Sequence, residues 1–299
     1  MIYVNSERFV KGRFPNGEAD FTPLEELFGS GDPIRVGLVY ESDEDLFALM
    51  LLAEYLKDNG CMGRSSLAVD FMPYSQMDRE MRDHVFSLKY VAKLVNNCGF
   101  NSVFVNDPHS NVTPALLDRM CADYPAARRL AHDIRTMHMY DVIMYPDNGA
   151  AKKYGEVLSN SDICVLPKEL DGKPELVALG VPVVYGSKRR DLATGDIVSY
   201  DLVVPDGVSL KGKRVAIIDD LVMGGRTFIE AAKRLREAGA SKVALYVSHL
   251  MPQSKDFVDT LGGGLLDAVL TGSETYIPDY STLAAKSGKE SGDGDGPGE

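Results

Sequence analysis

The residues best suited to chemistry stand in one short run, residues 217–227, which reads IIDDLVMGGRT. Two adjacent carboxylates, Asp219 and Asp220, precede a turn that contains Gly224 and Gly225. Glycine lets the backbone approach a ligand closely and point successive N–H groups at an anion. Two carboxylates where a parallel strand ends suit sugar hydroxyls or a bridging metal ion rather than phosphate oxygens. The run therefore predicts a sugar-phosphate site; the alternative is an ordinary strand-to-helix turn with solvated aspartates, which the paired carboxylates disfavour.

The elements around this run would place it at the edge of a sheet. Residues 214–218 are expected to form an apolar strand. The residues after the turn predict an amphipathic helix, because apolar side chains recur with helical spacing at Phe228, Ala231, Ala232, Leu235 and Ala238. The N-terminus of such a helix carries the positive end of its dipole and attracts phosphate. Strand, glycine turn and helix together predict a phosphate-binding unit.

Short β-rich runs alternate with helical stretches along the rest of the chain. We expect further strands at residues 34–40, 66–74, 102–107, 141–146, 163–166, 182–185 and 243–248. A helix is expected after the capping signal formed by Ser42 and Asp45, and another at about 85–98. This alternation predicts an α/β protein with largely parallel sheets, arranged as two doubly wound domains.

The length of 299 residues suffices for two domains of ordinary size. We expect an N-terminal domain at residues 1–145 and a C-terminal domain at residues 146–285. Residues 287–299 contain almost no apolar side chain, so they cannot offset the entropy that is lost on ordering. A disordered tail is therefore expected at residues 286–299.

The composition argues against nucleic-acid and membrane partners. The chain has 44 acidic and 32 basic side chains and a net charge of -12 at pH 7, so it does not attract nucleic-acid phosphates or anionic membranes. No segment approaches the roughly 20 apolar residues that span a bilayer, and the first residues lack a signal-peptide core. We expect a cytoplasmic protein. The four cysteines are widely spaced without a C-x-x-C pair, so neither a zinc site nor a disulfide framework is expected.

At residues 217–227 the sequence resembles the phosphoribosyl-binding loop of type I phosphoribosyltransferases and of ribose-phosphate pyrophosphokinases (PRPP synthetases). Five segments resemble PRPP synthetases in order: two ATP segments at 14–18 and 72–79, a metal-site Asp-x-His at 107–109, a Pro-Asp-x-Gly ribose turn at 146–149 and a catalytic Lys-x-Arg flexible loop at 188–190. Simple phosphoribosyltransferases lack this set, so the resemblance, which runs from about residue 10 to about residue 280, favours PRPP synthetases. It implies two domains of the type I phosphoribosyltransferase kind, with ATP and metal on the N-terminal side.

The resemblance also implies a reaction and the residues that perform it. Family enzymes transfer the β,γ-diphosphoryl group of ATP to the 1-hydroxyl of ribose 5-phosphate and release AMP, with Mg²⁺ as cofactor. Such a transfer depends mainly on neutralising charge on the moving oxygens. By resemblance, His109 and Asp147 hold magnesium, and Lys188, Arg190 and His109 are catalytic. A structural histidine and a solvated basic loop are the alternatives, which the order of the motifs disfavours.

The resemblance assigns two binding regions as well. The ribose hydroxyls and the 5′-phosphoryl group of the acceptor would be bound by Asp219, Asp220, Gly224, Gly225, Arg226 and Thr227. ATP would be bound by Phe14, Asn16, Glu18, Gln76, Asp78 and Arg79. In family oligomers the first ATP segment reaches a neighbouring subunit, so we expect a homo-oligomer. The alternative for residues 14–18 is a plain strand-turn-strand.

Two departures from the family pattern bear on the substrates. Gln76 stands where the family has an arginine that contacts ATP phosphate. Residues 223–227 read Met-Gly-Gly-Arg-Thr where the family reads Asp-Thr-Gly-Gly-Thr, so an acid and a hydroxyl are lost and Arg226 is gained. The pocket is therefore more positive and suits an anion longer than a monophosphate.

Two acceptors are consistent with this loop. One is ribose 5-phosphate, and the other is ADP-ribose, which PRPP-synthetase-like enzymes of some bacteriophages convert to ADP-ribose 1-pyrophosphate in NAD salvage. A catalytically weak regulatory subunit related to PRPP synthetases is a further alternative, because Gln76 and Met223 both replace functional residues. Retention of His109, Lys188 and Asp219 favours an enzyme.

Overall fold

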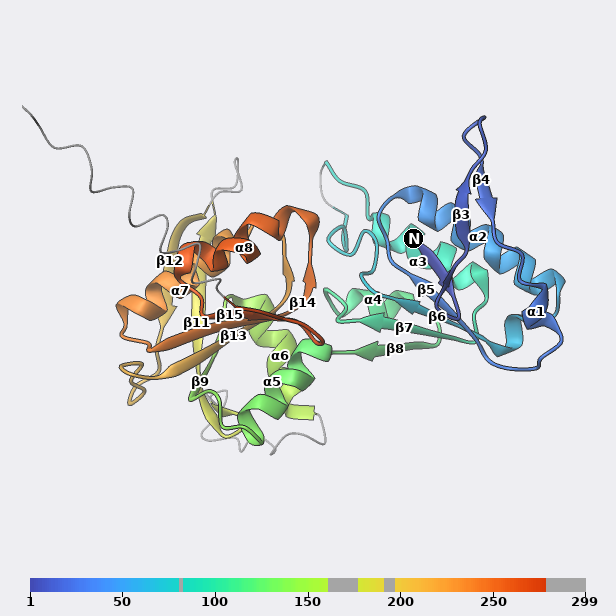
Figure 1. Cartoon of the computed structure of the whole chain (residues 1–299). Coiled ribbons are helices and arrows are strands. Elements are labelled where there is room, and N and C mark those ends of the chain that lie inside the picture. The colour runs from blue at the N-terminus through green and yellow to red at the C-terminus, as the bar shows by residue number, and fades with distance from the viewer. Residues whose placement is uncertain (81–82, 161–176, 191–196, 278–299) are drawn as a thin grey trace, which may run out of the picture. The chain divides into compact units, whose positions relative to one another are not determined.

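A computed structural model of the chain describes residues 1–80, 83–160, 177–190 and 197–277 (Figure 1). The chain divides into two compact units, Met1–Pro125 and Ala126–Glu299. Each unit is α/β with a sheet that is largely parallel, which confirms the expected fold class. The strand expected at 163–166 and the tail expected at 286–299 lie outside the described residues. Among the helices that are described, none is long and apolar enough to cross a lipid bilayer.

The division between the units lies earlier in the chain than the boundary expected after residue 145. Helix α5 (Pro125–Arg135), apart from its first residue, and strand β9 (Val142–Tyr145) belong to the second unit. The hydroxyl of Tyr246, which is a buried residue of the second sheet, donates a hydrogen bond to Asp133 Oδ2 of α5 at 2.6 Å. This contact between residues far apart in the chain anchors α5 to the second sheet.

The sheet of the first unit has the strand order β2-β1-β5-β6-β7-β8. Its strands are β1 (Ile2–Val4), β2 (Glu7–Arg8), β5 (Ile34–Leu38), β6 (Ser65–Val69), β7 (Ser102–Asn106) and β8 (Met120–Asp123). Strands β5 to β8 are parallel neighbours in chain order, whereas β1 is antiparallel to both β2 and β5. Consecutive parallel neighbours are joined by right-handed crossovers, which put the connecting helices on one face. These helices are α2 (Asp43–Asp58), α3 (Ser87–Cys98) and α4 (Val112–Leu116).

Helix α2 shows how the sequence builds this unit. It begins where the capping signal predicts, and the N–H of Ser42 donates to Asp45 Oδ2 at 3.1 Å. Its inner face buries Leu49, Leu52 and Leu56 completely. Each apolar side chain of this size contributes about 1.5–3 kcal/mol when it is removed from water. The cap and the apolar face together fix the position of the helix on the sheet.

A separate hairpin of β3 (Val10–Arg13) and β4 (Ala19–Phe21) projects from the first unit (Figure 1). Its turn consists of residues 14–18. The N–H of Phe14 donates to the Glu18 carbonyl at 2.8 Å, and the N–H of Gly17 donates to the Phe14 carbonyl at 2.9 Å. Residues 14–18 thus have the strand-turn-strand form. The short helices α1 (Glu25–Phe28) and η1 (Met62–Arg64) lie in connections of the same unit.

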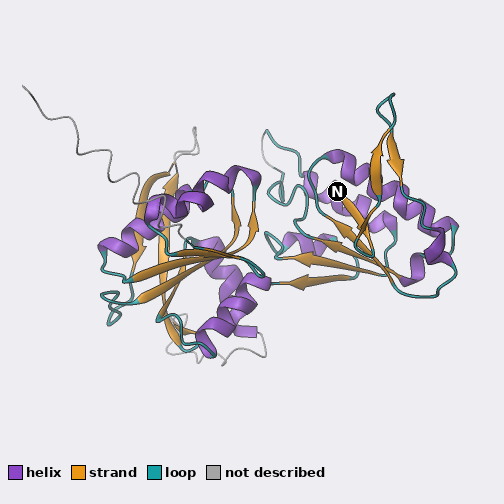
Figure 2. Ribbon diagram, viewed as in Figure 1, coloured by secondary structure: helices purple, strands orange, loops and turns teal. Residues whose placement is uncertain are grey.

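The sheet of the second unit has the strand order β10-β11-β9-β13-β14-β15-β16, and β12 also pairs with β11. Figure 2 shows its strands in orange, with purple helices on both faces. The strands besides β9 are β10 (Val177–Ala178), β11 (Val181–Arg190), β12 (Ile197–Val203), β13 (Arg214–Val222), β14 (Lys242–Leu250), β15 (Ala268–Leu270) and β16 (Thr275–Tyr276). The five strands from β11 to β15 in this order are parallel to their neighbours. Strands β10, β12 and β16 pair antiparallel.

The direction of winding reverses between β9 and β13. From β9 the chain passes through α6 (Asn148–Asn160) to β11 on one side. From β13 it passes through α7 (Arg226–Glu237) to β14, and then through η2 (Pro252–Ser254) and α8 (Lys255–Gly264) to β15 on the other side. The helices therefore cover opposite faces, with α7 and α8 above the sheet and α5 and α6 below it in Figure 1. Open α/β sheets bind ligands at such a switch point, at the carboxyl ends of the strands.

Helix α7 and the sheet beneath it form much of the second core. Four of the predicted apolar positions, Phe228, Ala231, Ala232 and Leu235, are buried. Ala238 was expected on the same face but is exposed, because the helix ends at Glu237. The periodicity predicted the packed face correctly and overran the C-terminus by one residue.

An ion pair joins β9 and β13 at the end of the sheet opposite the switch-point crevice. The guanidinium of Arg214, at the start of β13, donates to both carboxylate oxygens of Asp141, at 3.0 and 2.8 Å. The backbone N–H of Arg214 adds a third hydrogen bond at 2.9 Å. These contacts with Arg214 lower the pKa of Asp141 to about 2. The pair aligns the amino ends of the two strands and so supports their register.

Candidate active site

The carboxyl ends of β9 and β13 bring together residues that are far apart in the sequence. The two strands run parallel, with Ile217 beside Met144. Continued by two residues, this register brings Asp219 to the level of Pro146. Asp147 is the next residue after Pro146. The carboxylates of Asp219 and Asp147 are close enough to interact electrostatically. The predicted ribose turn and the predicted carboxylate pair therefore belong to one site.

Strand β13 is longer than the predicted strand at 214–218, because it continues to Val222. Asp219 and Asp220 consequently lie within the strand, rather than standing beyond its end. Pairing with β14 continues along this stretch, with Asp219 beside Val247 and Val222 beside Leu250. This pairing satisfies the backbone groups of the polar residues and explains the extra length.

The two carboxylates are unusually buried for ionisable groups. Burial raises the pKa of Asp219 well above its ordinary value, and the nearby carboxylates of Asp220 and Asp147 raise the pKa further. Asp220 is 6% exposed. Buried carboxylates in mutual contact destabilise a fold unless cations or ligands compensate for them, and they are typical of functional sites.

One cation of this cluster, Lys153 of α6, was missed in the sequence. Its Nζ lies 3.5 Å from Asp220 Oδ2, and its side chain is only 13% exposed. The preceding residue, Lys152, is exposed. Helical geometry thus turns one of two adjacent lysines toward the sheet. The adjacent residues Lys152 and Lys153 shortly after the ribose turn could have indicated a cation at the site. Which of the two side chains faces the sheet depends on how α6 packs.

Asp147 is held ionised by two donors. Lys188 forms an ion pair and hydrogen bond with Asp147 Oδ2, and the N–H of Ala150 donates to Asp147 Oδ1 at 3.0 Å. Burial raises the pKa of Asp147, but these donors outweigh it, so the pKa lies below its ordinary value. Asp147 therefore carries a negative charge at neutral pH.

Lys188 lies on a strand, whereas a flexible loop was expected at 188–190. Strand β11 continues to Arg190, beyond the predicted strand at 182–185, and Lys188 pairs with Tyr200 across the hairpin. The polar sequence at 187–190 lacks the apolar alternation that marks a strand, so its cross-strand pairing was not predictable locally. Arg190 is described through its backbone alone, and its catalytic role stays a prediction.

The glycine turn after β13 has the predicted form. Gly225 has a φ of 74° and caps α7, which begins at Arg226 and is 12 residues long. A Cβ at residue 225 would lie 2.1 Å from Cδ2 of Phe257 in α8, so only glycine fits there. Gly224 and Arg226 are exposed, and Thr227 is half-buried. The positive end of a helix dipole therefore stands at the carboxyl edge of the sheet, directly after the carboxylate pair.

The predicted metal-site segment of the first unit follows β7. Asp107 is buried, has a φ of 41°, and donates its N–H to the Asp123 carbonyl at 2.6 Å. His109 is half-buried two residues later. Asn106 Nδ2 donates to Asp70 Oδ1 at 3.1 Å, so β6 and β7 both carry polar groups at their carboxyl ends. A strained backbone among polar groups at this edge is common at functional sites.

Magnesium fits Asp147 as an ion that keeps water and substrate ligands. Within the described part of the chain, no three His, Cys, Asp or Glu side chains lie together to hold a metal ion. Mg²⁺ often binds through one or two carboxylates plus substrate phosphates and water. Asp147 is suited to this because it is ionised and 24% exposed. His109 belongs to the first unit, so a site that it shares with Asp147 stays a prediction.

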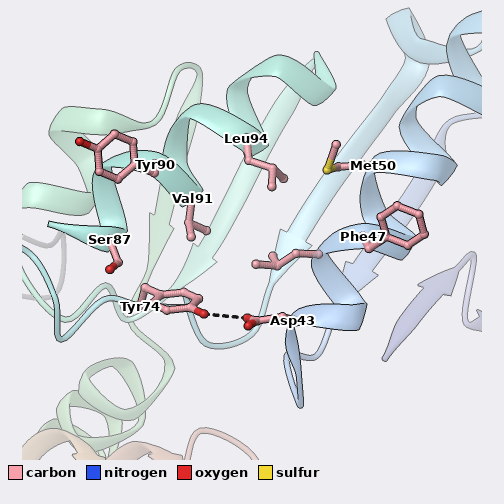
Figure 3. A pocket seen from close by; sticks show the side chains of 9 residues that line it. Asp43, Phe47, Met50, Tyr74, Ser87, Tyr90, Val91 and Leu94 are labelled. Atoms are coloured by element: carbon pink, nitrogen blue, oxygen red, sulfur yellow. Dashed lines mark hydrogen bonds between the residues drawn. The ribbon is translucent and has the colours of Figure 1, made fainter. Parts of the chain in front are cut away.

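Tyr74, in the second predicted ATP segment, shares a hydrogen-bond acceptor with Tyr40. The hydroxyls of Tyr74 and Tyr40 both donate to Asp43 Oδ1, at 2.8 and 2.7 Å; the Tyr74 bond is drawn in Figure 3. The hydrogen bond from Tyr40, and to a smaller extent that from Tyr74, holds the pKa of Asp43 below its ordinary value. Because Asp43 is the first residue of α2, the two bonds tie residues 72–79 to that helix.

Tyr74 and Asp43 border a groove of about 440 Å³ between α2 and α3 (Figure 3). Its other lining residues are mostly apolar: Leu46, Phe47, Met50, Ser87, Tyr90, Val91 and Leu94. The predicted ATP residues lie elsewhere in this unit. Asn16 Nδ2 donates to Glu18 Oε2 at 2.9 Å, Arg79 Nε donates to Asp78 Oδ1 at 3.2 Å, and Phe14 and Gln76 are exposed. Their role in binding ATP stays a prediction.

Known proteins resemble this chain in both sequence and fold. Residues 165–262 match the family described as phosphoribosyl transferase domain. The ribose-phosphate pyrophosphokinase of Saccharolobus solfataricus is 25% identical over 71% of this chain and 66% of that enzyme, just under two thirds of its length. The same enzyme of Sulfolobus acidocaldarius is 24% identical over 91% of this chain and 89% of its own. The crystal structure of phosphoribosylpyrophosphate synthetase from Mycobacterium smegmatis shares the fold, with a TM-score of 0.60 and 21% identity over 83% of this chain and 75% of that one.

The switch-point site and the phosphoribosyl transferase match define the class of protein, a transferase with a phosphoribosyltransferase-type α/β fold. The relatives that span most of the chain narrow this class. These matches support the chain as a divergent member of the ribose-phosphate pyrophosphokinase, or PRPP synthetase, family. They agree with the family expected from the motif series.

The turn geometry predicts different costs for two neighbouring glycines. Gly225→Ala should lower the free energy of unfolding by about 2–4 kcal/mol, because it combines a left-handed backbone with a clash against Phe257. Gly224→Ala meets no atom within 4 Å and should change it by less than about 0.5 kcal/mol. Urea unfolding followed by circular dichroism measures both values, and equal losses would contradict the described turn.

Proposed function

We propose that the protein transfers the β,γ-diphosphoryl group of ATP to the 1-hydroxyl of a ribose acceptor that carries a 5-phosphoryl group, and that it releases AMP. The observation that carries this proposal is the convergence of three features at one edge of the second sheet. These features are the glycine-capped N-terminus of α7, the buried carboxylate pair, and the Lys188–Asp147 ion pair. The relatives named ribose-phosphate pyrophosphokinase support the same reaction.

The acceptor would bind across the carboxyl end of β13. Its 5′-phosphoryl group would lie at the first turn of α7, where Gly224, Gly225 and Thr227 supply backbone and hydroxyl donors. Its ribose hydroxyls would donate hydrogen bonds to Asp219 and Asp220. Because a strand of fixed register carries the carboxylates and the turn follows directly, the distance between the two subsites is set by covalent geometry.

Lys188 would act on the transferring group. The acceptor 1-oxygen forms a bond to the β-phosphorus of ATP, the bond from that phosphorus to the α-β bridging oxygen breaks, and AMP leaves. Negative charge accumulates on the phosphoryl oxygens during this step, and an ammonium group placed beside them lowers the barrier. Arg190, farther along the same strand, and His109 of the first unit are the other residues that we assign to catalysis.

Magnesium would add charge neutralisation on the phosphate oxygens when bound. Asp147 and His109 are the residues that we propose to hold it. The six residues of the two N-terminal segments, Phe14, Asn16, Glu18, Gln76, Asp78 and Arg79, would contact ATP. The partners of the enzyme would accordingly be ATP and the sugar phosphate, in a homo-oligomer without nucleic acid or membrane.

The loop favours a second acceptor beside ribose 5-phosphate. Arg226 is the first residue of α7 and is exposed at the turn, where a phosphate would be bound. A guanidinium can hold two oxygens of a diphosphate in a bidentate manner. ADP-ribose carries a diphosphate on its 5′-carbon, so Arg226 supports it as an acceptor that would give ADP-ribose 1-pyrophosphate.

The reaction itself is tested by AMP release from magnesium-ATP with either acceptor. The wild-type protein should release AMP with at least one of them. Lys188→Ala should lower turnover by about 100- to 1,000-fold, because it removes a cation from the transferring group. It should change the free energy of unfolding by less than about 1 kcal/mol, because both members of the ion pair reach solvent.

The control for that variant is Lys255→Ala, which removes an exposed lysine paired with Asp259 and should leave turnover unchanged. No AMP from the wild type with either acceptor would contradict the proposed reaction. That outcome would favour the regulatory-subunit alternative.

The choice of acceptor is tested with Arg226→Gly. The KM for ADP-ribose should rise about tenfold, because a charged hydrogen bond to the diphosphate contributes about 1.5–3 kcal/mol. The KM for ribose 5-phosphate should change much less. Lys233→Ala, an exposed cation on the same helix, is the control for a general charge effect. Equal changes in KM for both acceptors would show that Arg226 does not determine which acceptor is preferred.

Lys153 should matter for acceptor binding. Lys153→Met leaves the buried carboxylate of Asp220 without its lysine partner, so the KM for the acceptor should rise about tenfold or more, equivalent to about 1.4 kcal/mol. Lys153→Arg should retain most of the affinity. Lys152→Met, at the exposed neighbouring position, should behave as the wild type, and steady-state kinetics that show the same loss for both positions would contradict this role.

A further inference from the structure

Tyr200 of β12 touches two of the segments that form the site. It lies directly opposite Lys188 in the hairpin of β11 and β12. Its side chain is buried, and its hydroxyl donates a hydrogen bond to the carbonyl oxygen of Pro146 at 3.0 Å. Pro146 immediately precedes Asp147. One side chain therefore connects the strand that carries Lys188 with the turn that carries its partner.

The chain is shaped around this contact. A Cβ at Gly186 would lie 2.0 Å from the hydroxyl oxygen of Tyr200 and 2.4 Å from the carbonyl oxygen of Pro146. Real Cβ atoms do not approach other atoms so closely, so residue 186 has to be glycine for the hydrogen bond to form. The missing side chain on β11 thus provides the space in which hydroxyl and carbonyl meet.

A third contact links Tyr200 to helix α7. Arg234 Nε of α7 donates to the backbone carbonyl of Tyr200 at 3.1 Å. Helix α7 is the helix that Gly225 caps. Tyr200 is therefore in contact with the ribose turn through its hydroxyl and with the phosphate-binding helix through its carbonyl.

We propose that Tyr200 is a positioning residue, whose hydroxyl holds the Pro146–Asp147 turn at the distance from β11 at which Lys188 reaches Asp147. Its effect on turnover rests on the proposed function. The hydroxyl does not touch the reacting groups, and it acts through Asp147. Burial, and next the carboxylates of Asp147 and Asp219, raise the pKa of Tyr200 above its ordinary value, so it remains a donor at neutral pH.

A matched control distinguishes positioning from simple stabilisation. Tyr246 is equally buried in the same sheet, and its hydroxyl donates to Asp133 Oδ2 at 2.6 Å, within the contact between β14 and α5. Tyr200→Phe removes the buried hydrogen bond to Pro146, and Tyr246→Phe removes the hydrogen bonds with Asp133 and Tyr140; both variants leave the ring in place. Both variants should fold, and both should lower the midpoint of urea unfolding. Only Tyr200→Phe should alter the catalytic geometry.

The kinetic arm measures AMP release by the full chain with magnesium-ATP and the better acceptor. Tyr200→Phe should lower kcat about 10- to 100-fold, with KM for both substrates within about twofold of the wild type, because misplacement of a group acting on the transition state has effects of that size. Tyr246→Phe should retain the wild-type kcat. A kcat for Tyr200→Phe equal to that of Tyr246→Phe would overturn the proposal.

A second arm needs no activity. The N–H groups of Ala150 and Ala151 donate to the side chain and the carbonyl of Asp147, both at 3.0 Å. In Tyr200→Phe, peptides that cover residues 146–151 should exchange amide hydrogens about fivefold faster or more, whereas Tyr246→Phe should leave them unchanged. If the wild type releases no AMP, the proposed function fails, and this arm alone decides the positioning role. Unchanged exchange in Tyr200→Phe would overturn it.

Discussion

The parallel pairing of β9 with β13 is the constraint on which the candidate site depends. The chain winds in opposite directions from these two neighbours, and in open α/β sheets such a reversal leaves a crevice between the carboxyl ends of the strands. Continued by two residues, their register brings Asp219 to the level of Pro146, which immediately precedes Asp147. The Arg214–Asp141 pair fixes that register from the other end of the strands. The turn, the carboxylate pair and the phosphate loop are all continuations of strands that this pairing aligns.

The alignment of β9 with β13 brings several negatively charged side chains close together. Three carboxylates, of Asp147, Asp219 and Asp220, lie within interaction range; Asp220 is buried, whereas Asp147 reaches solvent. Uncompensated buried charges cost several kcal/mol each. Lys153 from α6 and Lys188 from β11 approach from two different elements, and each pairs with a different aspartate. The candidate site therefore combines hydrogen-bond acceptors with cations, and neither kind of group neutralises the other completely.

The features that sequence could predict are those fixed locally. Glycine at 225 permits the left-handed turn, and the spacing of apolar residues after it defines the buried face of α7, so the phosphate loop and its helix were both predictable. The extension of β13 through Asp219 and Asp220 was not predictable, because polar residues show no strand pattern and pairing with β14 determines the length of the strand. The direction of Lys153 depends on how α6 packs. The hydrogen bond from Tyr246 to Asp133, which helps to place α5 in the second unit, likewise joins distant parts of the chain.

The hairpin of β11 and β12 changes how Lys188 can move. Residues of a free loop rearrange one by one, but in a ladder each residue is tied to a partner on the other strand. Parallel pairing of β11 with β9 ends at Tyr185, whereas pairing with β12 continues through Lys188. A movement of the Lys188 backbone away from Asp147 would therefore involve both strands of this hairpin arm. Collective motions of such an arm would take microseconds to milliseconds. The rate at which a substrate is enclosed or a product is freed would then be a property of the whole arm rather than of one side chain.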